Sequence, residues 1–138
     1  HPLTGDRLLR NDGPLPAPSF SGKEKPSPPK KTQRSDSLFL KNRTFFTDVT
    51  KESKIHSSAI GYGLGIAVAD INNDGWPDLY IGNDFHENDY LYINQKNGTF
   101  SDELTQRTAA TSQFSMGVDV ADINNDALPD IISMDMLP

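Results

Sequence analysis

The stretch GIAVADINNDGWPDLYIG spans residues 65–82 and recurs 52 positions later as GVDVADINNDALPDIIS, residues 117–133. In each copy an apolar run leads into the pattern Asp-x-Asn-x-Asp, and a Pro-Asp pair leads out into a second apolar run. Short runs rich in Val, Ile and Ala that are bounded by Asn, Asp, Gly and Pro favour β-strands joined by a turn. The repeat therefore predicts strand, loop and strand, twice over.

Both loops, residues 70–78 and 122–130, carry oxygen ligands at alternate positions. Hard oxygen ligands without Cys or His select Ca²⁺ over zinc or copper, and alternate side chains of a tightly wound loop can converge on one ion. We therefore expect about two Ca²⁺ ions per chain, one in each loop. The expected ligands are Asp70, Asn72, Asp74, the carbonyl of Trp76 and Asp78 in the first loop, and Asp122, Asn124, Asp126, the carbonyl of Leu128 and Asp130 in the second.

An EF-hand loop opens in the same way, so the twelfth loop position distinguishes the two alternatives. An EF-hand needs a bidentate Glu at that position and helices on both sides. Here the position holds Ile81 in the first loop and Ser133 in the second, and prolines lie inside both loops. The flanking runs are also typical of strands, which disfavours the EF-hand interpretation.

The sixth loop position differs between the copies, with Gly75 in the first and Ala127 in the second. A sharp turn there calls for a left-handed backbone, which costs a residue other than glycine about 1–2 kcal/mol. We expect the second loop to bind its ion more weakly or to use a slightly different turn.

These residues resemble a known family. AVADINNDGWPDLYIGND and VDVADINNDALPDIIS are similar to the FG-GAP or VCBS-type repeats of calcium-binding β-propellers, found in integrin α-chain heads and in many bacterial secreted proteins. The intervening NDYLYINQKNGTFSDELT resembles the linking segment of the bacterial ASPIC/UnbV-type, cartilage-acidic-protein-like group. The resemblance covers residues 38–138 and implies one propeller blade per repeat, with Ca²⁺ held in a loop between adjacent strands.

The chain length limits how much of a propeller is present. A closed propeller has about 4–8 blades, and blades bury their faces only against neighbouring blades. A chain of 138 residues with a 52-residue repeat holds fewer than three. We predict an all-β partial propeller of about two to two and a half blades, completed by a longer parent chain or by another subunit.

The predicted organisation has three parts. Residues 1–13 form the first strand of an incomplete blade, residues 14–37 form a Pro/Lys-rich exposed insertion, and residues 38–138 form the two repeats. The insertion contains six prolines, which disfavour helix and central strand. Residues 1–37 have a net charge of +3 and residues 38–138 a net charge of −9, so the acidic balance belongs to the repeats and disfavours nucleic acid as a partner.

A second group of polar residues follows the exit strand of the first loop. We consider Asp84, His86, Glu87 and Asp89 as candidate ligand-binding residues, although we favour a solvent-exposed turn joining two strands. There is no nucleophile elbow, no P-loop and no G-x-G-x-x-G motif, so the sequence predicts no catalytic function. No apolar run approaches the 18 residues of a membrane helix, so we also expect no membrane span.

Three functional classes remain open. The first is a calcium-binding interaction or adhesion module that is secreted, periplasmic or on the outer cell surface, with an unidentified protein or glycan partner. The second is a carbohydrate-binding or carbohydrate-active propeller, which needs a carboxylate pair or an aromatic platform on one face. The third is a subunit of a larger cell-surface assembly that docks through the open edges of the partial propeller.

Overall fold

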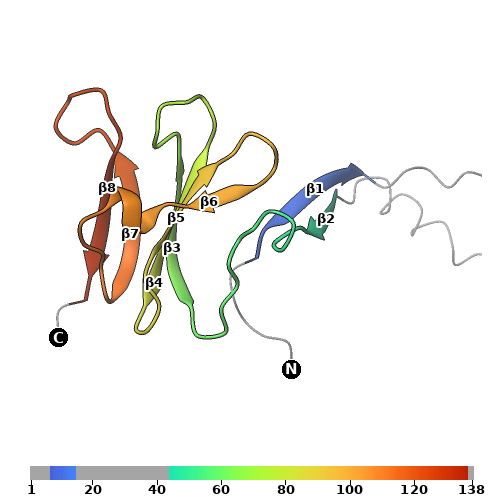
Figure 1. Cartoon of the computed structure of the whole chain (residues 1–138), viewed down its shortest axis with the longest axis horizontal. Coiled ribbons are helices and arrows are strands. Elements are labelled where there is room, and N and C mark those ends of the chain that lie inside the picture. The colour runs from blue at the N-terminus through green and yellow to red at the C-terminus, as the bar shows by residue number, and fades with distance from the viewer. Residues whose placement is uncertain (1–6, 15–43, 137–138) are drawn as a thin grey trace, which may run out of the picture. The chain divides into compact units, whose positions relative to one another are not determined.

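The computed structural model describes residues 7–14 and 44–136, which form two units (Figure 1). The first unit contains the described residues 7–8 and 49–136, and the second contains residues 9–14 and 44–48. Within these described residues every pair of strands is antiparallel. This confirms the predicted all-β fold.

The second unit is a two-stranded sheet. Strand β1 (Leu9–Pro14) pairs with β2 (Thr44–Asp48), with a bulge between Asn11 and Gly13. Gly13 has a φ of 76°, a left-handed backbone angle that glycine adopts without strain. Apart from Pro14, the predicted insertion at 14–37 lies outside the described residues, as do residues 1–6 of the predicted first strand.

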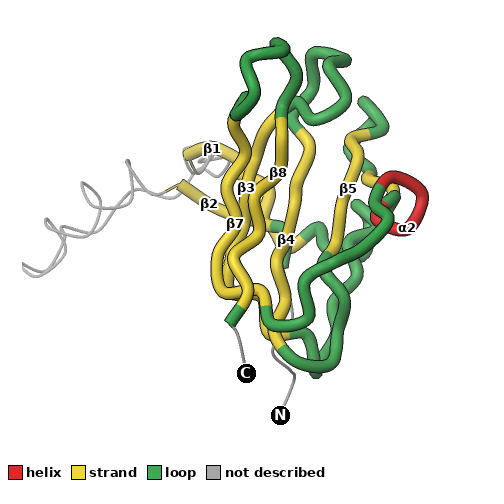
Figure 2. The backbone as a smooth tube through the Cα atoms, turned by 90° about the vertical axis from the view of Figure 1, so that its left-hand side faces the viewer, coloured by secondary structure: helices red, strands yellow, loops and turns green. Residues whose placement is uncertain are grey.

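The first unit contains a four-stranded meander followed by a two-stranded sheet (Figures 1 and 2). Strands that pair in chain order through tight connections are the architecture of a propeller blade, so the meander corresponds to one blade and the two-stranded sheet to the beginning of another. The meander consists of β3 (Tyr62–Ala69), β4 (Asp78–Asp84), β5 (Tyr90–Asn94) and β6 (Phe100–Asp102), and the second sheet of β7 (Ser115–Ala121) and β8 (Asp130–Asp135).

One short helix lies between the two sheets in the sequence. Helix α2 (Leu104–Arg107) begins after β6 and inserts Leu104 into the core. Between β2 and β3, residues 50–54 form hydrogen-bonded turns in which Ser53 N–H donates to the Val49 carbonyl.

Both faces of the meander are apolar, because β4 and β5 are central strands with buried side chains on each side. One face contributes Ala67, Tyr80, Leu91 and Ile93 to a core with Leu104, and Val118, Val120 and Ile131 of the second sheet pack against this core. The other face contributes Ile81, Tyr90 and Tyr92 to a second core with Ile55. A sheet with two apolar faces needs a layer on each side, as a propeller blade does.

Strand β7 lies unusually close to β3 and β4 (Figure 2). A Cβ placed on Gly82 would lie 2.3 Å from Ser115 Oγ and 2.7 Å from Val118 Cγ2, and one on Gly65 would lie 3.0 Å from the Val118 nitrogen. Only glycine leaves room for this approach. Ser115 is fully buried there and shares a hydrogen bond of 2.8 Å with Ser133 Oγ.

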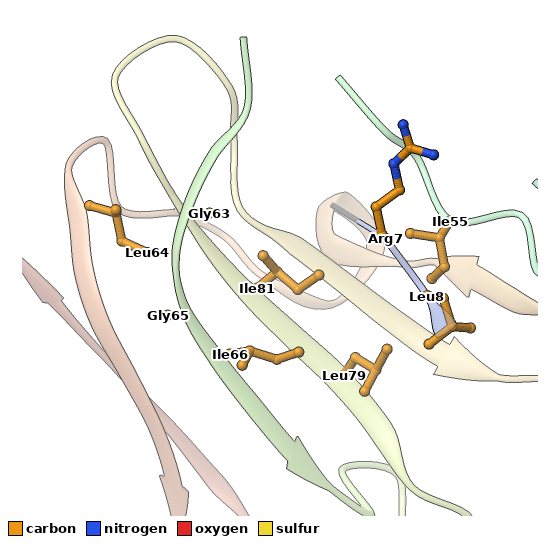
Figure 3. A pocket seen from close by; sticks show the side chains of 9 residues that line it. All are labelled: Arg7, Leu8, Ile55, Gly63, Leu64, Gly65, Ile66, Leu79 and Ile81. Atoms are coloured by element: carbon orange, nitrogen blue, oxygen red, sulfur yellow. The ribbon is translucent and has the colours of Figure 1, made fainter. Parts of the chain in front are cut away.

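The opposite face of β3 and β4 is partly open. Leu8 and Ile55 cover one part of it and line a pocket of about 240 Å³, together with Ile66 and Leu79 (Figure 3). Ile66 and Val68 remain 61% exposed. This face therefore combines an apolar surface with incomplete cover.

Candidate metal loops

The first loop connects β3 to β4 and is wound around the carboxylate of Asp70. Asp70 Oδ1 accepts the Asp74 N–H at 2.9 Å, and Asp70 Oδ2 accepts the Gly75 N–H at 2.8 Å. Asn72 Oδ1 also accepts the Asp74 N–H, at 3.0 Å, and Asp74 Oδ1 accepts the Trp76 N–H at 3.0 Å. These bonds draw the first, third and fifth loop positions into one turn, as their spacing in the sequence predicts.

Asp78 closes the loop at its exit. Its side chain is fully buried, and Asp78 Oδ2 accepts the N–H of Ile71 at 3.0 Å. Asp78 Oδ1 accepts the N–H of Asn94 on β5 at 2.8 Å. The carboxylate therefore joins the start of the loop, its end and the neighbouring strand.

The second loop repeats this hydrogen-bond pattern almost bond for bond. Asp122 accepts the N–H groups of Asp126 at 3.1 Å and of Ala127 at 2.9 Å. Asn124 Oδ1 accepts the Asp126 N–H at 2.9 Å, and Asp130 Oδ2 accepts the Ile123 N–H at 3.0 Å. The loops at 70–78 and 122–130 thus fold into the same turn.

The backbone angles also agree between the loops. Asn73 and Gly75 have φ of 57° and 86° in the first loop, and Asn125 and Ala127 have φ of 60° and 65° in the second. The expectation of a different turn in the second loop is therefore wrong, because Ala127 adopts the left-handed angle in spite of its Cβ. The remaining expectation, weaker ion binding by the second loop, stays a prediction.

The first loop has a cationic neighbour that the sequence did not indicate. Lys96 Nζ lies 3.3 Å from Asp74 Oδ2, and Asn72 Nδ2 donates to the same oxygen at 3.0 Å. Partial desolvation acts to raise the pKa of Asp74. The hydrogen bonds from Asn72 and Trp76 and the contact with Lys96 outweigh it, so the pKa lies below its ordinary value.

The donor set fits a hard cation by its chemistry. All expected side-chain ligands are carboxylate or amide oxygens, which Ca²⁺ prefers, and a carboxylate offers about four lone-pair sites, so a hydrogen bond to a loop amide does not exhaust it. The side chains of Trp76 and Leu128 are 46% and 54% exposed, so only their carbonyls are expected to contribute. Within residues 7–14 and 44–136, no three acidic or histidine side chains already converge as a metal cluster.

The second group of candidate residues lies at the opposite end of β4 and is divided by the fold. Asp89 is buried and accepts the Tyr80 O–H at 2.7 Å and the Asn83 N–H at 2.8 Å. Desolvation raises the pKa of Asp89, although these two bonds oppose the change. Asp89 is therefore part of the blade's internal hydrogen bonding.

Glu87, Asp84 and His86 lie nearer the surface. Glu87 accepts the Tyr90 O–H at 2.5 Å and lies 3.4 Å from His56 Nε2. Hydrogen bonds from Ser58 and Tyr90 lower the pKa of Glu87. Asp84 is half-buried, and among the described residues its Oδ1 has no hydrogen-bond partner, while His86 is exposed beside the ring of Phe85.

Comparison with known proteins identifies the segment that carries the two loops. Residues 70–133 match the FG-GAP-like repeat. The matched segment begins at the first expected ligand of the first loop and extends past the last ligand of the second. The FG-GAP-type repeat is thus supported for this segment, whereas the resemblance to the ASPIC/UnbV-type group stays a prediction.

Proteins similar to this chain include integrin α-chains. The chain is 29% identical over 112 residues to integrin alpha-3 of Cricetulus griseus, covering 72% of this chain and 11% of that protein. It is 37% identical over 82 residues to integrin alpha-7 of Homo sapiens, covering 51% of this chain and 7% of that protein. It is 36% identical over 84 residues to integrin alpha-6 of Gallus gallus, covering 53% of this chain and 8% of that protein. The chain therefore spans about a tenth or less of the length of these relatives.

Proposed function

We propose that this chain is part of a calcium-stabilised β-propeller that serves as a non-catalytic interaction or adhesion module. The observation that carries the proposal is the pair of loops at 70–78 and 122–130. They share one hydrogen-bond pattern, one backbone conformation and one set of oxygen donors. Such agreement at a 52-residue interval follows when both loops are built for the same ligand.

The ion would be held by the loop carboxylates, the loop amide and one backbone carbonyl in each repeat. When bound, Ca²⁺ supplies positive charge among three carboxylates that otherwise repel one another. Asp70 and Asp78 lie at the end of β3 and the start of β4, so their shared ligand would fix the two strands together. Anything that binds only the folded state stabilises it, so the ion's role is structural.

The repeat also accounts for the partly open face of β3 and β4. At the 52-residue interval, Ile66, Val68 and Leu79 correspond to Val118, Val120 and Ile131. The second trio is the surface by which β7 and β8 pack on the meander. The first trio is the equivalent surface of the first repeat, so we propose that another blade packs on it.

We propose an adhesion or interaction role rather than an enzymatic one, and the similarity to integrin α-chains supports it. The role of the whole protein is part of the proposal, because the chain matches only a small fraction of each relative. We propose a secreted, periplasmic or outer-surface location, where Ca²⁺ is plentiful and affinities of about 10⁻⁴–10⁻³ M suffice. Within the described residues, the structure has no helix of the length and hydropathy needed to cross a bilayer.

A second candidate function, binding of a carbohydrate or another small ligand, rests on an aromatic group at the end of the meander opposite the loops. The ring of Phe85 lies 6.5 Å from that of Tyr62 and 5.8 Å from that of Phe114, in edge-on arrangements. Phe85 and Tyr62 are 52% and 55% exposed, and Asp84 and His86 adjoin Phe85 in sequence. Glycan-array binding that is lost in Phe85→Ala would favour this candidate.

Calorimetric titration of the chelator-treated chain with Ca²⁺, together with thermal melts, tests the leading proposal. We expect saturable binding near two ions per chain and a raised melting temperature. Asp70→Asn and Asp122→Asn should each remove about one ion, whereas Asp119→Asn, on β7 outside the loops, should remove none. Absence of binding by the unaltered chain would refute the proposal.

A further inference from the structure

The turn between β5 and β6 lies directly against the first loop. Asn94 donates its N–H to Asp78 Oδ1 at 2.8 Å and its side-chain amide to the Pro77 carbonyl at 3.0 Å. Lys96 then places Nζ 3.3 Å from Asp74 Oδ2. Two expected ligands of the first loop, Asp74 and Asp78, are thus contacted from a segment about twenty residues further along the chain.

Lys96 is held in this position by its own turn. Its N–H donates to Asn94 Oδ1 at 2.9 Å, and its φ of 62° is left-handed, which a lysine adopts only when its surroundings impose it. The turn is closed by the Gln95 N–H, which donates to the Thr99 carbonyl at 2.9 Å, and by Gly98 with a φ of 83°. The backbone at Lys96 is therefore fixed beside the loop, while the side chain can still rotate away because it is 48% exposed.

We propose that Lys96 is a built-in competitor of the metal ion in the first loop. This inference rests on the proposed calcium function. Without an ion, the ammonium group neutralises part of the negative charge at Asp74. An ion that takes Asp74 as a ligand displaces Lys96 Nζ from Oδ2 and repels it, so binding at the first loop is weaker than its carboxylates alone would give.

The second loop provides the internal comparison. Asp126 occupies the position of Asp74 and makes the same bonds to the Leu128 N–H and the Asn124 amide. Within the described ranges, Asp126 has no lysine or arginine beside it. Lys96 thus weakens ion binding by the first loop, whereas the left-handed Ala127 weakens ion binding by the second.

Luminescence of Tb³⁺, an oxygen-seeking probe for Ca²⁺ sites, separates the loops. Trp76 is the chain's single tryptophan and belongs to the first loop, and the equivalent residue of the second loop is Leu128. Emission excited through tryptophan therefore reports ions in the first loop. Competition with Ca²⁺ then gives the affinity for Ca²⁺ itself.

The decisive variant is Lys96→Gln in the full chain at low ionic strength. We expect a Kd of the tryptophan-excited phase about three- to tenfold lower than in the unaltered chain, because a positive charge within a few ångströms of the ion is removed. The difference should shrink as salt is added. Lys96→Arg, which keeps the charge, and Lys51→Gln, which removes an exposed charge elsewhere, should both bind like the unaltered chain.

The outcomes separate this inference from the proposed function. Unchanged or weaker binding by Lys96→Gln, with normal binding by the unaltered chain, overturns the role of Lys96 and leaves the calcium loops standing. If neither protein binds Tb³⁺ or Ca²⁺, the proposed function fails and the inference fails with it. Binding by both proteins, tighter in Lys96→Gln, would support both.

Discussion

Substitution of Gly82 by Ala tests the close approach of β7 to the meander. The added methyl group would meet Ser115 Oγ at 2.3 Å and Val118 Cγ2 at 2.7 Å. Ser115 cannot move aside cheaply, because it is fully buried and bonded to Ser133 Oγ at 2.8 Å. Overpacking costs about 1–3 kcal/mol and loss of the buried hydrogen bond about 1 kcal/mol.

A smaller effect acts in the opposite direction. Alanine restricts the unfolded chain more than glycine does, which stabilises the fold by about 0.4–1 kcal/mol. We therefore expect Gly82→Ala to lower the free energy of unfolding by about 2–3 kcal/mol. For a unit of this size, the melting temperature should fall by roughly 10 °C.

Chemical denaturation monitored by circular dichroism measures this change, and Gly117→Ala on β7 is the matched control. A Cβ on Gly117 meets only Met134 Cε, at 3.6 Å, which is ordinary van der Waals contact. The double variant Gly82→Ala/Ser115→Gly removes Ser115 Oγ and Cβ and should recover part of the lost free energy of unfolding. A double-mutant cycle isolates the coupling between positions 82 and 115. A neutral Gly82→Ala, or equal losses in both glycine variants, would show that the packing of β7 is not as close as described.

The loops and the buried acids give two further predictions. Ala127→Gly should stabilise the ion-free chain by up to about 1 kcal/mol, because it removes an alanine from a left-handed backbone angle. Gly75→Ala should destabilise the ion-free chain by about 1 kcal/mol for the same reason. Denaturation curves in which both variants change stability in the same direction would contradict this. The raised pKa of Asp89 means that its contribution to stability falls as pH rises from about 3.8 through the folded-state pKa. The lowered pKa of Glu87 means that its contribution is present above about pH 4.5 and is lost as pH falls through the folded-state pKa. In the acidic range around these values, Asp89→Asn and Glu87→Gln should therefore change the slope of stability against pH in opposite directions, and parallel curves would refute this.

The parts of the fold that sequence could predict are local. The Asp-x-Asn-x-Asp spacing defines which side chains bond within each loop, and the apolar runs before and after it define the strands. The sixth loop position was also informative, because a left-handed backbone was required there and Ala127 adopts it. All of these features depend on residues within one turn of each other.

The parts that sequence could not predict depend on contacts between distant segments. Lys96 reaches Asp74 only because β5 pairs with β4 and its turn folds back over the loop. Asp89 resembles the exposed acids beside it in sequence, yet its bond to Tyr80 places it in the core. No spacing rule connects these pairs, because the packing of strands brings them together.

The equivalence of the repeats does not extend to their outer faces. Gly82 leaves room for β7, and Ala67 belongs to the core on which β7 packs. At the 52-residue interval they correspond to Met134 and Asp119 on the second sheet. Met134 is 65% exposed and occupies the position equivalent to Gly82. At Gly82 a single Cβ would already lie 2.3 Å from Ser115 Oγ, so a methionine side chain leaves even less room for a strand to pack as closely. A blade cannot pack on β7 and β8 as β7 and β8 pack on the meander, since Met134 would occupy the required space and Asp119 would be buried. The two repeats of this chain therefore present different faces, with Gly82 and Ala67 in the first and Met134 and Asp119 in the second.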